Sequence, residues 1–334
     1  MKMDLALIWA AILAFAVLAY VLLDGFDLGV GILFPFLGGR DERSLAMNTI
    51  APVWDGNETW LVLGGGGLFA VFPLVYAILL PALYPLIIAM LLGLIFRGVA
   101  FEFTVQATKL RGFWEFAFFA GSLIATFAQG VALGAIVQGI KVLDRSYAGG
   151  NWDWLSPFSL LTGTSLVIGY ALLGATWLIY KTEASVRARV SQLARPLAFA
   201  MAAAIAIVSL ITVWLQPQYL ARWLGWPQSL YTAIVPILCV LCLYLLITGI
   251  QKQQDAKPFL AAQSLFIVCY VGLGISLYPN LVPPAISYLD AAAPPASLEF
   301  LLVGAVFLIP IILLYTAYSY WVFRGKVQLG EGYH

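Results

Sequence analysis

Long apolar runs separated by short polar stretches make up this chain from end to end. A helix of roughly 20 apolar residues crosses the hydrocarbon core of a bilayer, and nine runs reach that length. They lie near 6–36, 53–72, 75–97, 115–140, 158–180, 197–215, 229–249, 259–278 and 299–322. The pattern predicts an all-α, polytopic membrane protein.

The composition agrees with that prediction. Of the 334 residues, 63% are hydrophobic and 10% are charged, whereas soluble domains carry about 25% charged residues. The formal net charge of +1 gives no support for a nucleic-acid partner. The first apolar run lacks a small-residue cleavage pattern, so we expect it to stay in the mature protein.

The second run is the least regular, because it begins with the polar "WDGNETW" and contains four consecutive glycines. Each glycine weakens a helix by about 1 kcal/mol relative to alanine. With nine spans and the N-terminus outside, 13 of the 17 Lys and Arg residues lie on the cytoplasmic side, and with eight spans 12 do. Since short cytoplasmic loops are enriched in Lys and Arg, we expect nine spans, with the N-terminus outside and the C-terminus cytoplasmic.

The expected architecture is a single integral membrane domain over residues 1–334. The basic stretch 181–195 separates two groups of four helices, and a peripheral helix follows the proline-rich segment 278–299. That proline-rich segment is expected to be an extended loop. The three parts are a first four-helix bundle, a second four-helix bundle and the last helix, which cover residues 1–145, 155–280 and 298–323.

Cysteine and histidine residues give little support for metal chemistry. Cys239, Cys242 and Cys269 all lie in apolar runs, and a Cys-x-x-Cys pair inside a membrane helix is expected to pack as two small hydrophobes. The single histidine, His334, is the last residue. Because haem iron is usually held by His, Met or Cys side chains, we expect this chain to ligate no haem and no metal ion.

Two carboxylates interrupt the first apolar run, in "DGFDLGVG". A charged side chain at the centre of a spanning helix costs about 2.5–3.5 kcal/mol, so it usually marks a proton or ion route, a ligand site or a buried pair. Asp24 and Asp27 share one helix face, while Gly25 and Gly29 form a face suited to close helix packing. The alternative is that headgroups and caps satisfy the acids, but the apolar residues 30–37 beyond them favour a functional role.

A second polar cluster opens the irregular run "APVWDGNETWLVLGGGGLFAVFP". Asp55 and Glu58 have the spacing of an N-cap acid and a capping-box glutamate. Capping does not explain why Trp54, Asn57 and Trp60 crowd the same two turns ahead of four glycines, which allow close approach of a backbone or ligand. Pure capping and a polar entry path into the membrane both remain open.

The third cluster, "FRGVAFEF", ends the third apolar run. Arg97 is expected to close that helix on the cytoplasmic side, where such side chains snorkel to the headgroups. Glu102 is expected in an amphipathic interfacial turn, with Arg97 as its candidate counter-ion. The first three helices thus bring acids to one side of the membrane, while the remaining helices carry hardly any ionisable residues away from their ends.

These three motifs, together with the late "PIILLYTAYSYW", resemble subunit II of the cytochrome bd-type quinol oxidases, the cyanide-insensitive branch included. The resemblance implies a subunit of a bacterial inner-membrane complex that oxidises quinol and reduces oxygen to water. In that family, subunit I carries haem b and haem d type groups, and subunit II is its haem-free, pseudo-symmetric partner. The resemblance further implies contact with the quinone pool and membrane lipid, a bound quinone in some members, and a small single-helix subunit.

The resemblance also implies that subunit II contributes a cytoplasmic proton-uptake route. Matched by motif, the route acids are Asp24, Asp27, Asp55, Glu58 and Glu102. The residues that line or support them are Trp54, Asn57, Trp60 and Arg97. Motif matching places no quinone pocket on this chain.

Two other functions fit part of the pattern. A secondary transporter also places acids beside glycine-interrupted helices, but it predicts such acids in both halves, and the second half lacks them. A purely structural subunit would use the carboxylates to cap helices or to pair with a partner chain. Neutralising the acids would then lower the yield of the complex and leave the activity of the surviving complex intact.

Overall fold

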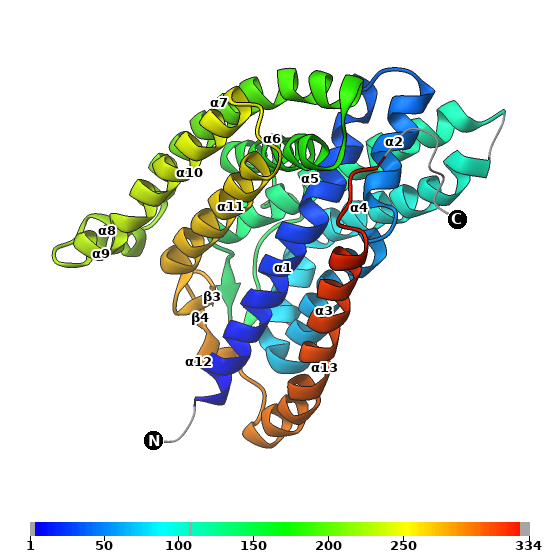
Figure 1. Cartoon of the computed structure of the whole chain (residues 1–334). Coiled ribbons are helices and arrows are strands. Elements are labelled where there is room, and N and C mark those ends of the chain that lie inside the picture. The colour runs from blue at the N-terminus through cyan, green and yellow to red at the C-terminus, as the bar shows by residue number, and fades with distance from the viewer. Residues whose placement is uncertain (1–3, 107–108, 328–334) are drawn as a thin grey trace.

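The computed structural model describes residues 4–106 and 109–327, so Lys2 and His334 lie outside the described residues. Helices dominate the fold (Figure 1). The helices of the first half are α1 (Leu5–Leu33), η1 (Phe34–Phe36), α2 (Arg40–Ile50), α3 (Trp54–Val71), α4 (Pro73–Gln106) and α5 (Arg111–Gln138). Those of the second half are α6 (Pro157–Lys181), α7 (Ala184–Leu215), α8 (Pro217–Leu224), α9 (Gln228–Thr232), α10 (Ile234–Gln251), α11 (Ala256–Leu277), α12 (Tyr288–Ala291) and α13 (Pro295–Val322).

Two short antiparallel hairpins complete the described chain. Strand β1 (Val142–Leu143) pairs with β2 (Ser146–Tyr147), and β3 (Asn280–Val282) pairs with β4 (Ile286–Ser287). The second hairpin and the one-turn helix α12 occupy the proline-rich segment that was expected to be extended throughout.

Eight of the described helices are long and apolar enough to cross a membrane. They are α1, α4, α5, α6, α7, α10, α11 and α13. The segment predicted as the second span forms α3, which is not among the eight because its first two turns are polar. Helix α3 lies beside α1 and α13 (Figure 1), and its 18 residues extend about 27 Å. The all-α, multi-pass class is confirmed, and the count of nine spans stays a prediction.

Two other boundaries differ from the sequence expectation. Helix α4 does not end at Arg97 but continues for nine more residues, and Arg97 is paired inside the protein and does not reach the headgroups. The basic stretch 181–195 is not a loop, because α7 begins at Ala184 and takes up most of it.

Helices α1 and α6 pack backbone against backbone. A Cβ atom added at Gly29 would lie 1.8 Å from the carbonyl oxygen of Tyr170, and one added at Gly174 would lie 2.3 Å from the carbonyl carbon of Gly29. Because only glycine permits that approach, the small-residue face predicted on α1 is in fact a helix-packing face. The neighbouring Gly25 lies against the Tyr170 ring.

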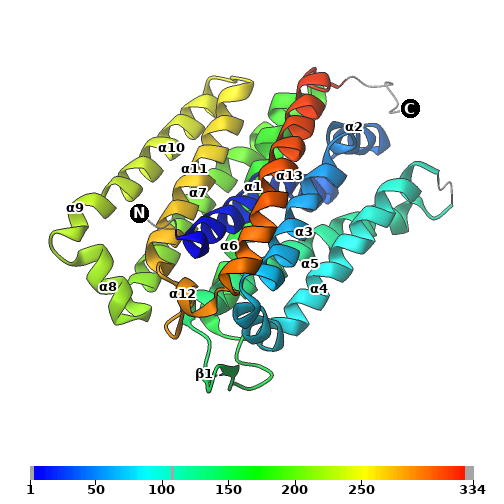
Figure 2. The same ribbon diagram turned by 90° about the horizontal axis from the view of Figure 1, so that it is seen from below.

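This α1–α6 contact lies between the two halves of the chain. In Figure 2, α3, α4 and α5 lie to one side of it, and α7, α10 and α11 lie to the other. One hydrophobic cluster includes buried side chains of α1, α4, α5, α6, α7, α10 and α11, so the halves share a core. Cys239 and Cys242 belong to that cluster, as predicted for two small apolar side chains.

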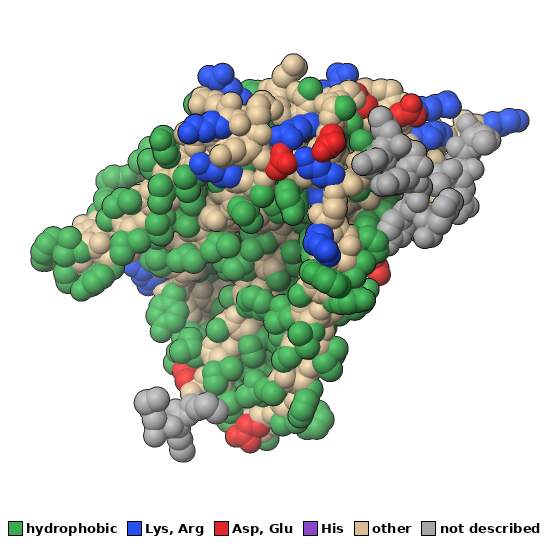
Figure 3. Space-filling view, in the orientation of Figure 1, with side chains coloured by type: hydrophobic (Ala, Val, Ile, Leu, Met, Phe, Trp, Pro, Cys, Tyr) green, Lys and Arg blue, Asp and Glu red, His purple; other side chains and the backbone are tan. Residues whose placement is uncertain are grey.

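Charged side chains gather at one end of the molecule. Figure 3 shows Lys and Arg side chains concentrated at the end drawn uppermost, while the flanks are largely apolar. Several of these cations form ion pairs that join different helices. Examples are Arg43 with Glu115 and Arg189 with Glu42.

Glu42 connects α2 to α7 at this end. Burial alone would raise the pKa of the Glu42 carboxyl, but the backbone N–H of Gly38 donates to Oε2 at 2.7 Å and Arg189 lies 3.0 Å from the same oxygen. These contacts outweigh burial, so the pKa of Glu42 lies below its ordinary value. The ionised carboxylate therefore stabilises the folded protein.

We predict that Gly29→Ala destabilises the protein by about 1–3 kcal/mol, because the added methyl group overpacks the α1–α6 contact. The measurement is the thermal unfolding midpoint of the purified protein. The control is Gly274→Ala in α11, where an added Cβ meets nothing within 4 Å. Equal midpoints for the two variants would contradict this account of the contact.

We also predict that Glu42→Gln lowers the unfolding midpoint at pH 7 and that the difference disappears in acid. A carboxyl whose pKa is lowered by folding contributes stability above its ordinary pKa of about 4.3, and that contribution is lost as the pH falls through the lower folded value. Unfolding scans between pH 7 and pH 3 measure this. Asp41→Asn, at the exposed neighbouring position, is the control. A difference that persists at the acid end would show that the effect is not electrostatic.

Candidate functional site

Two carboxylates of α1, Asp24 and Asp27, are fully buried, with side-chain exposures of 0%. The packing of Gly25 and Gly29 on α6 leaves the opposite side of α1 for the acids, which contact α3 and α4. The sequence predicted this division of faces from spacing alone. Burying two ionisable groups is costly, so their partners determine what the site can do.

Arg97 of α4 is the charged partner of the buried acids. Its Nη1 lies 2.8 Å from Oδ1 of Asp24, and its Nη2 donates to Oε2 of Glu58 at 3.4 Å. The Arg97 side chain is 1% exposed, so the expectation that it snorkels to the headgroups is wrong. The expected pairing of Arg97 with Glu102 is also wrong, because Asp24 and Glu58 neutralise the guanidinium from α1 and α3.

An amide satisfies one side of Asp27, and a phenol in turn donates to that amide. Nδ2 of Asn57 donates to Oδ2 of Asp27 at 2.7 Å and lies 3.2 Å from the carbonyl oxygen of Leu23. The hydroxyl of Tyr320, in α13, donates to Oδ1 of Asn57 at 3.0 Å. The site is therefore shared by four helices, α1, α3, α4 and α13.

Sequence reasoning missed Tyr320 as a site residue. It stands in the motif "PIILLYTAYSYW", whose clustered hydroxyl groups in an otherwise apolar helix were the available signal. The signal was weak because the neighbouring Tyr315 and Tyr318 are 62% exposed and have no such contact with the acids.

Two of the predicted route acids lie outside the buried cluster. Asp55 and Glu102 are exposed, and neither side chain makes a hydrogen bond or ion pair with the rest of the described chain. The capping expectation for Asp55 and Glu58 is wrong, because Val53 is the N-cap of α3 and no side chain caps that helix. Glu58 is 27% exposed and is thus the acid that joins the buried cluster to the surface.

Both predicted tryptophans pack around this cluster. Trp54 stacks on Phe101 at a centroid distance of 5.4 Å, and the Arg97 guanidinium lies 5.8 Å from the Trp54 ring. Trp60 is 1% exposed and packs with Tyr20 of α1. The Trp54 ring covers the Arg97 guanidinium and helps to keep bulk water from the ion pair, which strengthens its electrostatic interactions.

Several buried polar atoms of the cluster have no hydrogen-bond partner among the described residues. They include Oδ2 of Asp24, Oδ1 of Asp27 and Nε1 of Trp60. Such atoms are rare in protein interiors, and each calls for an explanation such as ordered water or a functional role. Two of them belong to the buried carboxyls themselves, so the described residues alone do not meet the hydrogen-bonding capacity of this site.

A second polar chain begins one helical turn from Asp24. Nε2 of Gln129, in α5, donates to the Tyr20 hydroxyl at 2.8 Å, and the Tyr170 hydroxyl of α6 lies 3.4 Å from Oε1 of Gln129. Sequence reasoning missed this chain of hydrogen bonds, because an uncharged polar residue in an apolar helix is a weaker signal than a carboxylate. It extends the polar interior from α1 toward the centre of the α5–α6 contact.

The charge balance of the cluster limits its protonation states. Three carboxyl groups, those of Asp24, Asp27 and Glu58, surround one guanidinium, that of Arg97. If all three were ionised, two negative charges would be uncompensated in a water-poor interior, at high cost. The arrangement is therefore suited to hold at least one proton that the carboxyls share.

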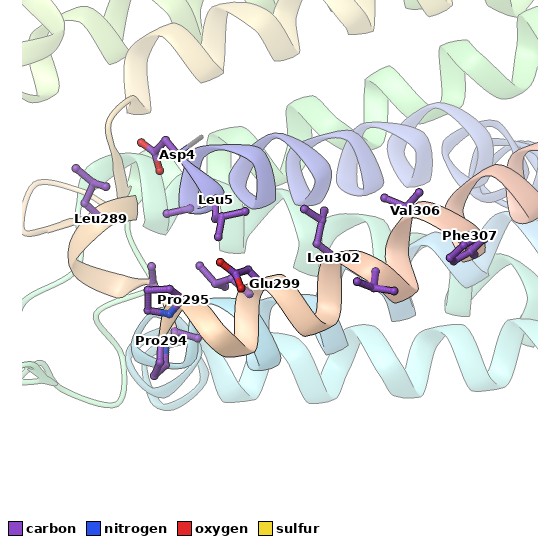
Figure 4. A pocket seen from close by; sticks show the side chains of 14 residues that line it. Asp4, Leu5, Leu289, Pro294, Pro295, Glu299, Leu302, Val306 and Phe307 are labelled. Atoms are coloured by element: carbon purple, nitrogen blue, oxygen red, sulfur yellow. The ribbon is translucent and has the colours of Figure 1, made fainter. Parts of the chain in front are cut away.

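A separate groove lies at the other end of α1. This groove of about 1240 Å³ lies between the first turn of α1 and the start of α13, and Asp4 and Glu299 are the charged residues among its described lining (Figure 4). Some 20 residues of α1 separate Asp4 from Asp24, so the groove takes no part in the buried cluster. Within the described part of the chain, no group of His, Cys, Asp and Glu side chains is arranged to hold a metal ion.

Comparisons with known proteins give consistent matches. Residues 5–323 match the sequence model of the family described as cytochrome bd terminal oxidase subunit II. The chain is 30% identical to cytochrome bd-I ubiquinol oxidase subunit 2 of Escherichia coli (strain K12), over 97% of this chain and 95% of that relative. It is 28% identical to cytochrome bd ubiquinol oxidase subunit 2 of Bacillus subtilis (strain 168), over 97% of each chain.

The fold is also similar to that in a solved structure of the bd oxidase from Geobacillus thermodenitrificans. The TM-score is 0.77 at 17% sequence identity, and the match covers 96% of this chain and 98% of that chain. At that identity the likeness concerns the fold alone.

We predict that Arg97→Gln is strongly destabilising, because it leaves Asp24 as a buried charge without a cation. Removing one partner of a buried pair costs about 3–5 kcal/mol. The double variant Asp24→Asn/Arg97→Gln removes both charges and is expected to recover much of that loss. The measurements are the thermal unfolding midpoint and the yield of folded protein.

Arg195→Gln, which removes an exposed arginine at the charged end, serves as the control and is expected to leave both readouts unchanged. A double variant no more stable than Arg97→Gln would mean that the ion pair is not what holds α1 and α4 together.

Proposed function

Since this chain belongs to the cytochrome bd terminal oxidase subunit II family, we propose that it is the haem-free subunit of a quinol:oxygen oxidoreductase in a bacterial inner membrane. Its relatives in Escherichia coli and Bacillus subtilis are named as subunits of cytochrome bd ubiquinol oxidases. Its partner is then subunit I, which carries the haem b and haem d type groups. The complex oxidises quinol from the membrane pool and reduces oxygen to water.

Within that complex the chain supplies part of a proton-uptake route. The observation that carries this proposal is the pair of fully buried carboxyls, Asp24 and Asp27, beside the partly exposed Glu58. Arg97 contacts both Asp24 and Glu58, and Asn57, next to Glu58 in α3, donates to Asp27. Oxygen reduction consumes protons, and hydrocarbon admits protons only along titratable groups and water. If the role were purely structural, apolar side chains of similar size would give equal or greater folding stability, since buried ion pairs seldom add stability.

The members of the cluster take different parts. Arg97 and Asp24 form the fixed ion pair, which sets the local field. Asp27, hydrogen-bonded to the neutral amide of Asn57, holds the proton that the excess of carboxyls requires. Glu58 takes protons from the surface, and the exposed Asp55 and Glu102 gather them at the entrance.

Ordered water completes the route in this proposal. Oδ2 of Asp24 and Oδ1 of Asp27 lack a partner among the described residues and belong to side chains three residues apart on α1. A water molecule needs two to four polar partners, and this group of atoms provides them. Proton transfer between the carboxyls then requires no large movement of any side chain.

The direction of uptake follows from the charge distribution. The proposed topology places the Lys- and Arg-rich end of Figure 3 in the cytoplasm, following the enrichment of these residues in cytoplasmic loops. Asp24 and Asp27 lie in the last three turns of α1, which ends at that side. The C-terminus is then cytoplasmic, and protons enter from the cytoplasm. The bound quinone and the small single-helix subunit implied by the resemblance are given no position here.

We predict that Asp27→Asn lowers quinol-driven oxygen consumption by the purified complex at least about tenfold, since an amide cannot carry the proton. Asp55→Asn is expected to slow turnover less, because an exposed acid is more easily bypassed. Haem content, measured from the absorption spectrum, is expected to stay near that of the unmodified complex in both variants.

Asp41→Asn removes another exposed acid, in α2, and is the matched control. Full activity of the Asp27→Asn complex would rule out the proposed route. Loss of assembled complex, with normal activity in the part that survives, would instead support a purely structural role for the acids.

A further inference from the structure

A cavity of about 360 Å³ lies between α1, α6, α11 and the end of α13. We infer that it binds an anionic phospholipid with a free headgroup hydroxyl, such as phosphatidylglycerol, from the leaflet at the charged end of the protein. The observations that carry this inference are two cations without acid partners, apolar walls and an unpartnered acceptor. None of them belongs to the proposed proton route.

The first cation is Lys181, the last residue of α6, which is 3% exposed. Its ammonium donates hydrogen bonds to the carbonyl oxygens of Phe323 and Gly325. No carboxylate of the described residues lies within 4 Å of it. Because burying an ammonium without a counter-ion is costly, an anion in the cavity would offset an uncompensated charge.

The second cation is Arg324, at the rim of the cavity. Its Nη1 donates to the carbonyl oxygen of Trp321 at 2.7 Å, and its guanidinium lies 4.9 Å from the Trp321 ring. It too has no carboxylate partner among the described residues. Nearby cations differ in this respect, since Lys326 pairs with Glu183 and Asp255.

Among the described residues that line the cavity, only Lys181 and Arg324 are charged, so this lining is positive. A phosphate matches this arrangement, because both cations keep N–H donors that their backbone contacts do not use.

The walls of the cavity indicate a lipid over a soluble phosphate. Most of them are apolar or aromatic, and the residues include Leu23, Phe26, Phe259 and Leu260. Phe26 stacks on Trp177 at 4.2 Å, which gives the cavity a rigid flank. Such a surface would bury acyl methylenes next to the headgroup site, whereas a soluble anion would leave it exposed to water.

One polar atom in the lining favours a headgroup that carries a hydroxyl. Oε1 of Gln263 is buried and has no hydrogen-bond partner among the described residues, although Nε2 of the same amide donates to the carbonyl oxygen of Leu22. A carbonyl-type oxygen accepts and cannot donate, so its complement is a ligand O–H or N–H. A glycerol headgroup supplies an O–H beside its phosphate.

The bound lipid would connect helices that otherwise meet loosely. Helix α13 buries a single residue, Leu298, and Lys181 holds its C-terminal end against α6. Tyr320, which lines the cavity, also donates to Asn57 in the buried cluster. A lipid in this cavity would thus fix the end of α13 in the position that this hydrogen bond requires.

The test is native mass spectrometry of the purified oxidase complex, delipidated and then titrated with phosphatidylglycerol, phosphatidylethanolamine or inorganic phosphate. We expect retention of phosphatidylglycerol over phosphatidylethanolamine. Arg324→Gln and Lys181→Gln are each expected to weaken phosphatidylglycerol binding about tenfold, the effect of losing one charge-assisted hydrogen bond. Arg195→Gln removes an exposed cation outside the cavity and is the matched control.

Gln263→Leu separates the hydroxyl contact from the charge. It is expected to weaken phosphatidylglycerol binding and to leave unchanged the binding of phosphatidylmethanol, an anionic phosphodiester lipid that has no headgroup hydroxyl. Because Lys181 also holds the chain end, Arg324→Gln decides the matter if Lys181→Gln misfolds. Equal phosphatidylglycerol binding by Arg324→Gln and Arg195→Gln would overturn the inference, and so would competition by inorganic phosphate alone. The readout is bound lipid and not oxygen consumption, so it stands apart from the test of the proton route.

Discussion

The ion pair between Arg97 and Asp24 is the interaction on which the arrangement of the first four helices depends. It joins α1 to α4 inside the protein, with Glu58 of α3 as a third member. The free-energy cost of removing the two charges from water is offset because aromatic rings pack around the pair and further polar groups surround it. The pair thus lies where α1, α3 and α4 meet, and α4 continues past its expected end.

Much of the fold was predictable because it follows from local patterns. Run length and apolarity gave eight of the helices, and the spacing of Asp24, Asp27, Gly25 and Gly29 gave the two faces of α1. The partner of each face was not predictable, since contacts between helices distant in the sequence leave no periodic signal. For that reason Arg97 was assigned to the surface, although it is buried.

The same limit applied to the site. The acids and the motif of α3 drew attention because charge in an apolar run is conspicuous, whereas Tyr320 and Gln129 were overlooked because a single neutral polar residue costs little to bury. Asp55 and Glu102 were grouped with the buried acids by motif, yet both are exposed. The sequence identified the kind of chemistry. Three-dimensional contacts were needed to tell which acids are buried and which are exposed.

The backbone contact of Gly29 with α6 also fixes the rotation of α1 about its own axis. Successive residues on a helix are rotated by about 100°. If the Gly29–α6 contact kept its place, inserting one residue between Asp27 and Gly29 would therefore turn the carboxyls about a quarter of a circle away from Arg97. The six residues from Asp24 to Gly29 must therefore keep a fixed spacing. We therefore expect members of this family to differ by substitutions in this segment of α1, and not by insertions or deletions.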